Sequence, residues 1–290
     1  MRLVKGHGTE NDFLVLDDLD GQVELTAELV RALCDRHAGL GADGVLRIVR
    51  SQRHPEAAAF AGQAAFFMDY RNADGSVAEM CGNGIRVVMA YLQRAGLVEW
   101  EAAVATRGGV KRVQARGDGL VTVHMGQPLT LADRPVVTAA PMPATPAAAT
   151  VLMPNPHVVV WVDGPEALAA LELGSAPVVT PSRADGQNVE FAYRPAQRHV
   201  VLRVFERGVG ETRSCGTGIC AVVVAAATAD GIGPDGRSWR VDVPGGTCEV
   251  TWQADGDVQL TGPAVLVADI SVEDDWLAAR THLQTSAAHS

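Results

Sequence analysis

Two stretches of the chain share one pattern: Met80-Cys81-Gly82-Asn83-Gly84-Ile85 and Ser214-Cys215-Gly216-Thr217-Gly218-Ile219. Each places a cysteine and two glycines before an apolar run without glycine, at residues 86–95 and 220–229, which is typical of a helix. The cysteine then lies at a helix N-terminus, where unpaired backbone N–H groups and the helix dipole favour a thiolate. The glycines let the backbone approach a bound anion closely. Two such loops in one chain predict a paired site.

The second half of the chain repeats the first around these two loops. Similar segments follow in the same order and at similar spacing: Asn11-Asp12-Phe13 and Asn155-Pro156-His157, Ala42-Asp43-Gly44 and Ala184-Asp185-Gly186, Asp69-Tyr70-Arg71 and Phe205-Glu206-Arg207. The run at 219–229 has no charged residue, so we expect that helix to be buried on every side. The pattern predicts an α+β protein of two pseudo-symmetric domains, each a mostly antiparallel β-sheet or barrel wrapped around a central buried helix.

Composition places the domain boundaries. Residues 1–128 form the expected N-terminal half, residues 129–150 a Pro/Ala-rich connector, and residues 151–267 the C-terminal half. We expect the segment 268–290 to pack back on the first half and its small, polar end, 281–290, to be frayed. Thr26 is expected to cap a helix that runs to about Arg36, and residues 51–62 to form a solvent-exposed loop.

Composition also excludes several classes of protein. The start of the chain turns polar too early for a signal peptide, and no apolar run is long enough to cross a bilayer, so we expect a cytoplasmic protein. With 34 acidic and 24 basic residues and no basic cluster, we expect neither a nucleic-acid nor a membrane partner. The five cysteines fit reduced thiols better than a disulfide framework. Lysine occurs only at Lys5 and Lys111, neither in a context suited to pyridoxal phosphate, and we expect no cofactor and no metal.

A paired arrangement of the two loops suggests a specific chemistry. The natural ligand of two helix N-termini is an anion such as a carboxylate, held by the N–H groups of Gly82, Asn83, Gly216 and Thr217. One thiol on each side of the carbon next to that carboxylate could invert its configuration: one thiolate removes the proton and the other thiol returns a proton to the opposite face. The sequence therefore predicts an isomerase acting on a small-molecule substrate.

The chain resembles the diaminopimelate epimerase family over nearly its whole length. The segments that carry the resemblance are His7-Gly8-Thr9-Glu10-Asn11-Asp12-Phe13, Arg71-Asn72-Ala73-Asp74-Gly75-Ser76, the two cysteine loops, Asn155-Pro156-His157, Asn188-Val189 and Glu206-Arg207-Gly208. The resemblance implies interconversion of LL- and meso-diaminopimelate, on the way to lysine and peptidoglycan, without metal or pyridoxal phosphate. It also implies that Cys81 and Cys215 are the acid–base thiols and that His157 and Glu206 set their protonation.

The resemblance implies a second set of residues that hold the non-reacting end of the substrate: Asn11, Asn72, Asn155, Asn188 and Arg207. These residue types suit a zwitterionic end, because a guanidinium can bind a carboxylate through two hydrogen bonds and amides both donate and accept. The likeness also implies a homodimer.

Two other functions remain open. One is a related racemase for another amino acid, such as proline or histidine, which would leave Arg207 and the asparagines without partners. The other is a non-catalytic protein in which Cys81 and Cys215 form a redox-switch disulfide. Zinc binding is disfavoured because neither loop has close Cys-x-x-Cys spacing. The other cysteines, Cys34, Cys220 and Cys248, are expected to be buried apolar residues.

Overall fold

The computed structural model describes residues 1–281, and the chain divides into two compact units. Unit 1 contains Met1–Gly8, Asp12–Val121 and the described residues from Ala264 to Thr281, and unit 2 contains Thr9–Asn11 and Thr122–Pro263. Residues 9–11 thus belong to unit 2, although the sequence analysis assigned them to the N-terminal half. The expectation of a frayed end at 281–290 concerns residues that, from 282 on, lie outside the described part of the chain.

Unit 1 contains a mixed sheet with neighbours in the order β20, β1, β2, β3, β4, β5, β6. The pairs β2–β3 and β4–β5 are parallel, whereas β3–β4, β5–β6 and β1–β20 are antiparallel. The strands are β1 (Arg2–Gly8), β2 (Asn11–Asp17), β3 (Gly44–Arg50), β4 (Phe66–Asn72), β5 (Glu101–Thr106), β6 (Gly109–Ala115) and β20 (Val265–Ser271).

Unit 2 repeats this pairing pattern, with β12–β14 and β15–β17 parallel and β14–β15 and β17–β18 antiparallel. The same alternation in both units confirms the predicted fold class of two similar α+β halves. Parallel pairs occur in each sheet among the more numerous antiparallel ones. The strands of unit 2 are β7 (Leu120–Gly126), β8 (Leu129–Leu131), β11 (Ala149–Leu152), β12 (Pro156–Trp161), β14 (Asn188–Ala196), β15 (His199–Glu206), β16 (Gly210–Thr212), β17 (Ser238–Val243), β18 (Gly246–Trp252) and β19 (Val258–Pro263).

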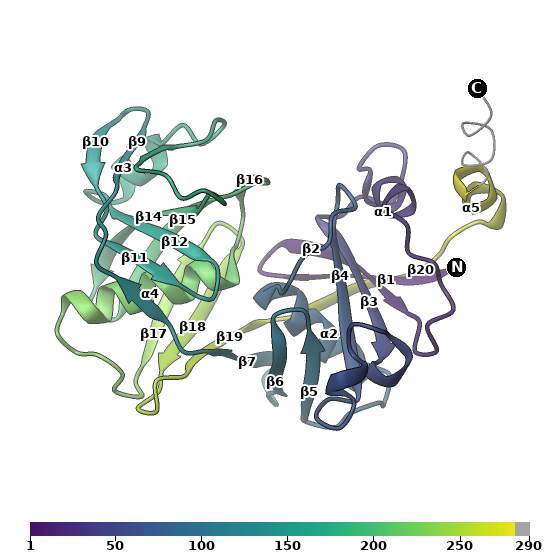
Figure 1. Ribbon diagram of the computed structural model, residues 1–290. Helices are drawn as coiled ribbons and strands as arrows, with labels where there is room; N and C mark the ends of the chain where they lie inside the picture. Colours follow the sequence, from purple (N-terminus) through teal and green to yellow (C-terminus); the bar gives the residue numbers. More distant parts are fainter. Residues whose placement is uncertain (282–290) are drawn as a thin grey trace. The chain divides into compact units, whose positions relative to one another are not determined.

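Each unit has one central helix that begins directly after a cysteine. In unit 1, α2 (Gly82–Arg94) contacts β1, β3, β5, β6 and β20. In unit 2, α4 (Gly216–Ala229) contacts β11, β12, β14, β15, β17, β18 and β19 (Figure 1). It is buried from its first residue to Ala227. A helix made only of Gly, Ala, Val, Ile, Thr and Cys can be surrounded in this way because no side chain needs a charged partner. The two central helices thereby fix where the cysteines lie.

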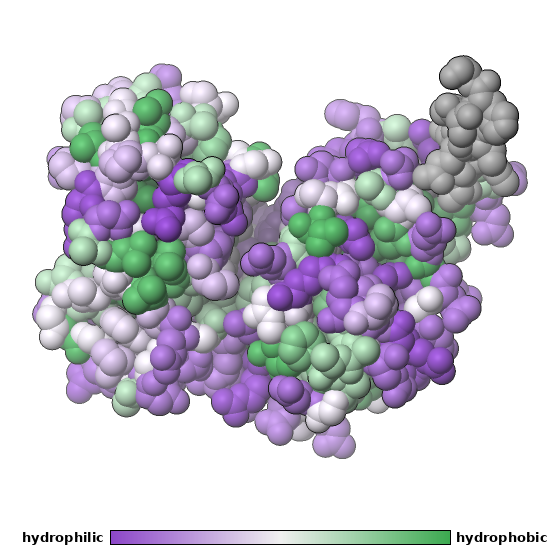
Figure 2. All heavy atoms as spheres, in the orientation of Figure 1, coloured by the Kyte–Doolittle hydropathy of each residue, from purple (hydrophilic) through white to green (hydrophobic). Residues whose placement is uncertain are grey.

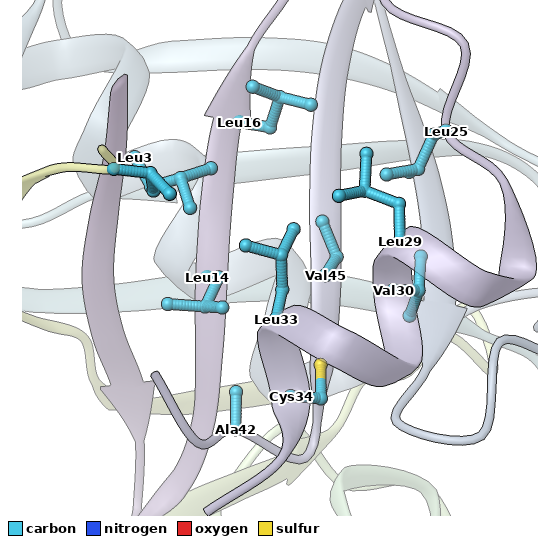
Figure 3. Packing of buried hydrophobic residues seen from close by; sticks show 11 residues of the cluster. Leu3, Leu14, Leu16, Leu25, Leu29, Val30, Leu33, Cys34, Ala42 and Val45 are labelled. Carbon is cyan, nitrogen blue, oxygen red and sulfur yellow. The ribbon is translucent and has the colours of Figure 1, made fainter. Parts of the chain in front are cut away.

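A second layer covers the outer face of the unit 1 sheet. Helix α1 (Ala27–Cys34) begins at Thr26, whose hydroxyl accepts from the Leu29 N–H at 3.2 Å, as expected for a cap. Figure 3 shows its side chains pointing toward strands β1, β2 and β3. This cluster comprises Leu3, Leu14, Leu16, Leu25, Leu29, Val30, Leu33, Cys34, Ala42, Val45 and Val272. Burial raises the pKa of Cys34 to about 12, so this cysteine acts as an apolar core residue.

The structure forms strands where composition suggested a connector. Within 129–150, β8, β9 (Val136–Ala139), β10 (Met142–Pro146) and the start of β11 are extended, and β9 pairs with β10 and β13 (Val178–Thr180). Strands β9, β10 and β13 form a separate three-stranded sheet with β10 at its edge, a position that tolerates proline. Val137, Ala139 and Ala147 pack with Leu168 of α3 (Pro165–Ala170). The segment therefore belongs to the core of unit 2.

The remaining elements lie in unit 1. The expected loop at 51–62 contains two 3-10 turns, η1 (Ser51–Arg53) and η2 (Ala58–Phe60), and buries Ser51 and Ala57. Helix α5 (Asp274–Thr281) follows β20.

Hydrophilic residues make up most of the surface visible in Figure 2, in keeping with a net charge of −10. In the part of the chain that the structure describes, every helix is too short or too polar to span a bilayer.

Candidate functional site

Cys81 is the N-cap residue of α2. Its backbone is extended (φ −140°, ψ 118°), and its Sγ accepts from the Gly84 N–H at 3.3 Å. The thiol therefore takes the place that a serine or aspartate side chain usually has at a helix start. A backbone donor and the positive end of the helix dipole both stabilise negative charge on this sulfur. The side chain is half-buried, so it is reachable from solvent.

Asn83 directs its side chain into unit 1. Its Oδ1 accepts from Arg86 Nη2 at 2.6 Å, and both residues are buried. A Cβ at Gly8 would lie 2.9 Å from the Asn83 carbonyl oxygen and 3.0 Å from Arg86 Nη2, so this packing requires glycine. Any contact of Asn83 with a ligand then uses its backbone. Sequence reasoning assigned no role to Arg86, which places a buried positive charge in the second turn of α2.

Asn72 ends β4 and forms the first corner of a turn. Its Nδ2 donates to Ser76 Oγ at 3.0 Å, and its N–H donates to the Ser76 carbonyl at the same distance. The turn contains Gly75 at φ +86°, where a Cβ would come within 2.6 Å of the Ala27 side chain. The turn is thereby fixed against the start of α1, with Asn72 half-buried at its edge.

Cys215 is the N-cap residue of α4 and lies in a more enclosed place. Its backbone is also extended (φ −124°, ψ 112°), its side chain is buried, and its Sγ lies 3.4 Å from Thr217 Oγ1. Burial, followed by the negative charges of Glu206 and Glu190, raises the pKa of Cys215 well above its ordinary value. The hydrogen bond to Thr217 only partly opposes that rise. Cys215 is therefore a protonated thiol around neutral pH.

Glu206 is the carboxylate next to this thiol. It ends β15, and the Thr212 hydroxyl on β16 donates to its Oε1 at 2.5 Å. Burial raises the pKa of Glu206, while hydrogen bonds from Thr212 and Cys215 and the charge of His157 lower it in part. Sequence reasoning missed Thr212, and a threonine in a short hairpin gives no signal that could have identified it.

His157 lies at the start of β12 and is fully buried. Its Nε2 lies 3.1 Å from Asn155 Oδ1, and its Nδ1 lies 2.6 Å from Glu190 Oε1. Asn155, which was expected to bind substrate, contacts the histidine. Glu190 was not expected at all. Its one signal in the sequence is an acidic residue between Val189 and Phe191, inside an otherwise apolar strand.

Asn188 connects the histidine to the loop of Arg207. Asn188 is buried, its Oδ1 accepts from the Arg207 backbone N–H at 3.0 Å, and its Nδ2 lies 3.4 Å from His157 Nδ1. The Arg207 side chain is exposed, and its Nη1 donates to the Asp185 carbonyl at 2.9 Å. The asparagine thus holds the backbone at Arg207 while the guanidinium remains accessible to an anion.

Asn11 belongs structurally with the Cys215 loop. Two residues before it, the hydroxyl of Thr9 lies 2.7 Å from that of Ser214, and Glu10 forms an ion pair with Arg213. A Cβ at Gly245 would lie 1.8 Å from the Thr9 carbonyl oxygen, so only glycine permits this close approach. These contacts bring half-buried Asn11 into unit 2.

Comparison with known proteins identifies the family. The family model for diaminopimelate epimerase matches residues 3–131 and 149–267. The chain belongs to the diaminopimelate epimerase family. It is 50% identical to a diaminopimelate epimerase of Streptomyces coelicolor over 281 residues, covering 94% of this chain and 96% of the relative. It is 48% identical to one of Thermobifida fusca over 282 residues, covering 93% of this chain and 97% of the relative.

Solved structures of more distant proteins share the fold of this family member. A phenazine biosynthesis protein of the PhzF family from Bacillus anthracis aligns with a TM-score of 0.70 at 15% identity, covering 94% of this chain and 99% of that chain. A probable proline racemase from Agrobacterium radiobacter gives a TM-score of 0.66 at 19% identity, covering 94% and 93%. The sequence comparison thus confirms the family, and the structural comparison confirms the fold.

Within the family member, the expected site residues fall into two groups. Unit 1 contains Cys81, Gly82, Asn83 and Asn72, and unit 2 contains Cys215, Gly216, Thr217, Asn155, His157, Asn188, Glu206, Arg207 and Asn11. All five cysteines are free thiols. Among residues 1–281, no three His, Cys, Asp or Glu side chains are grouped so as to hold a metal ion.

Proposed function

We propose that this chain interconverts LL- and meso-diaminopimelate, with Cys81 and Cys215 as the two acid–base groups. The observation that carries the proposal is that each unit has a cysteine as the N-cap of its central helix, in a chain 50% identical to a curated diaminopimelate epimerase. A helix N-terminus favours both the thiolate and a substrate carboxylate nearby. The family name supports the substrate.

The two thiols have different resting states in this proposal. The enclosed Cys215 begins as the proton donor, because burial and nearby carboxylates keep it protonated. Cys81 begins as the thiolate, because a backbone N–H and a helix N-terminus stabilise its charge and its side chain is not enclosed. One turnover moves a proton from the α-carbon to Cys81 and another from Cys215 to the opposite face. The roles are then reversed for the return reaction.

The other residues bind and orient the substrate. Backbone N–H groups of Gly82, Asn83, Gly216 and Thr217 are proposed to hold the carboxylate next to the reacting carbon. The distal amino acid end is proposed to contact Asn11, Asn72, Asn155, Asn188 and Arg207, of which Arg207 has the exposed guanidinium for a carboxylate. His157 and Glu206 are proposed to stabilise the charge states of Cys215. In keeping with this role, the hydrogen bond from Cys215 and the charge of His157 both lower the pKa of Glu206.

Hydrogen exchange tests the reaction. LL-diaminopimelate incubated with the reduced protein in deuterated water should yield the meso isomer with deuterium at one α-carbon, followed by mass spectrometry and chiral separation. Cys81→Ala and Cys215→Ala should each reduce interconversion by at least ~100-fold, because each removes one of the two proton carriers. Cys34→Ala, which removes a core thiol, is the matched control and should keep its activity. Normal interconversion by either of the first two variants would contradict the mechanism.

Proline is the competing substrate to include. A cyclic amino acid has no second zwitterionic end, so Arg207→Ala should not affect its turnover, whereas it should raise KM for diaminopimelate strongly. Faster turnover of proline than of diaminopimelate would favour the alternative racemase.

We also propose a cytoplasmic homodimer. Two exposed valines on β20, Val265 and Val267, are compatible with a partner surface. Sedimentation equilibrium tests the oligomeric state.

A further inference from the structure

Glu190 is a buried carboxylate whose role the reaction scheme leaves unassigned. It lies in β14 between two apolar neighbours and is fully buried. Its Oε1 is bound to His157, but its Oε2 has no hydrogen-bond partner among the residues that the structure describes. A buried carboxylate with one unsatisfied oxygen costs stability, and an apolar residue would fit the strand better. Its presence therefore indicates a function at the ring that it contacts.

Strand register places this carboxylate between the histidine and the cysteine helix. In the parallel pair β12–β14, His157 lies opposite Asn188 and Val159 opposite Glu190, so His157 and Glu190 share one face of the sheet. On that face, a Cβ at Gly218 would lie only 2.6 Å from Glu190 Oε1. The carboxylate is thus packed against the first turn of α4, where the helix dipole favours negative charge. That turn begins at Cys215.

The contacts of the His157 ring restrict its orientation. Glu190 Oε1 and Asn155 Oδ1 are both acceptors, at 2.6 Å and 3.1 Å, so each ring nitrogen has an acceptor on its own side. With the shorter contact removed, the ring loses its fixed Nδ1 donor position and can rotate or change tautomer. The imidazole charge acts on Glu206, and Glu190 and Glu206 both act on Cys215. A displaced ring would therefore alter the surroundings of the thiol.

We propose that Glu190 is a positioning residue for the epimerase reaction: it holds the His157 ring in place, with Nδ1 as donor, beside Glu206 and Cys215. This inference rests on the proposed function. Glu190 does not touch substrate, because its side chain is enclosed. It acts by accepting one hydrogen bond and by keeping a negative charge next to the imidazole.

Glu190→Gln tests the proposal with little change in volume. We expect kcat to fall about tenfold or more while KM changes less than about twofold, because the variant disturbs proton transfer and leaves the binding groups in place. The pH profile of kcat should also change, because Glu206 on β15 and Glu190 on β14 both act on Cys215, and His157 on β12 acts on Glu206. Glu211→Gln, an exposed carboxylate on β16, is the control and should behave like the unaltered protein.

Nitrogen NMR of the His157 ring provides a readout independent of turnover. The unaltered protein should give a far-downfield proton on Nδ1, and Glu190→Gln should lose that signal and shift the Nδ1 resonance. Gly218→Ala keeps every charge but displaces the carboxylate, so it should weaken the same signal. An unchanged ring spectrum and unchanged kcat in folded Glu190→Gln would overturn the proposal. The expected ring spectra without turnover of diaminopimelate would instead contradict the proposed function and leave the role of Glu190 at the ring intact.

Discussion

At the scale of single residues, the two cysteines differ although their helix positions match. Both are N-caps with extended backbone, but Cys81 is half-buried with an amide donor on its sulfur, whereas Cys215 is enclosed beside two carboxylates. A repeat at the level of sequence therefore does not make the two thiols chemically equivalent. The difference comes first from the burial of Cys215 and then from Glu206 and Glu190. Glu206 has no acidic counterpart in unit 1, because Tyr70 precedes Arg71 where Glu206 precedes Arg207.

The ionisation of Cys215 can be tested by alkylation. Because burial and then the Glu206 charge raise the pKa of Cys215, its thiolate forms, and reacts with iodoacetamide, only as the pH rises well above neutral. Glu206→Gln removes one negative charge and should move the alkylation midpoint to lower pH, by about one unit. Peptide mass spectrometry across a pH series measures the midpoint, with Glu211→Gln as the exposed control. A midpoint that stayed in place, or rose, would show that Glu206 does not act on this thiol.

At the scale of elements, the central helices were the most predictable features. The uncharged run at 219–229 could only be a buried helix, and α4 is buried through Ala227. Helix α1 and its Thr26 cap were also expected, although the helix ends at Cys34 and not near Arg36. Prediction was poorer where structure depends on distant contacts. Asn11 lies with the Cys215 loop because Thr9 meets Ser214, which is 205 residues away, and no local pattern encodes that contact.

Strands were missed where composition was misleading. Proline and alanine at 129–150 suggested a connector, yet the chain there forms short strands in which alternate Val and Ala side chains are buried. Glu190 was missed for a related reason: periodicity shows where a strand is, but which polar residue in it has a buried partner depends on register with β12. The local pattern thus predicted the positions of helices and strands well, but it predicted poorly which residues contact each other.

The burial of α4 leads to a stability prediction. Val223 is fully buried, so Val223→Ala should lower the free energy of unfolding by roughly 2 kcal/mol through lost apolar burial and a small cavity. Thr228→Ala in the exposed last turn of the same helix should change it by less than about 0.5 kcal/mol. Urea denaturation monitored by circular dichroism measures both. Equal effects of the two substitutions would mean that α4 is not enclosed on all sides.

At the scale of the whole molecule, the proposed mechanism takes one proton carrier from each unit. The same alternation of parallel and antiparallel pairs precedes and follows each cysteine helix, so the two units share one arrangement of strands around that helix. In a two-thiol reaction each cysteine serves one configuration of the α-carbon as base. Each cysteine alone should therefore remove the α-hydrogen of one isomer and not of the other.

This division predicts complementary half-reactions. In Cys215→Ala, the remaining Cys81 thiolate can remove the α-hydrogen of one isomer and return a deuteron to the same face, so that isomer exchanges without inversion. In Cys81→Ala, Cys215 should do the same for the other isomer, more slowly near neutral pH and faster as the pH rises, because its pKa is raised. Incubation of LL- and meso-diaminopimelate separately in deuterated water, with chiral separation and mass spectrometry, measures both exchange and inversion. The double variant should exchange neither isomer. Exchange of the same isomer by both single variants would mean that the two thiols do not serve opposite faces of one carbon.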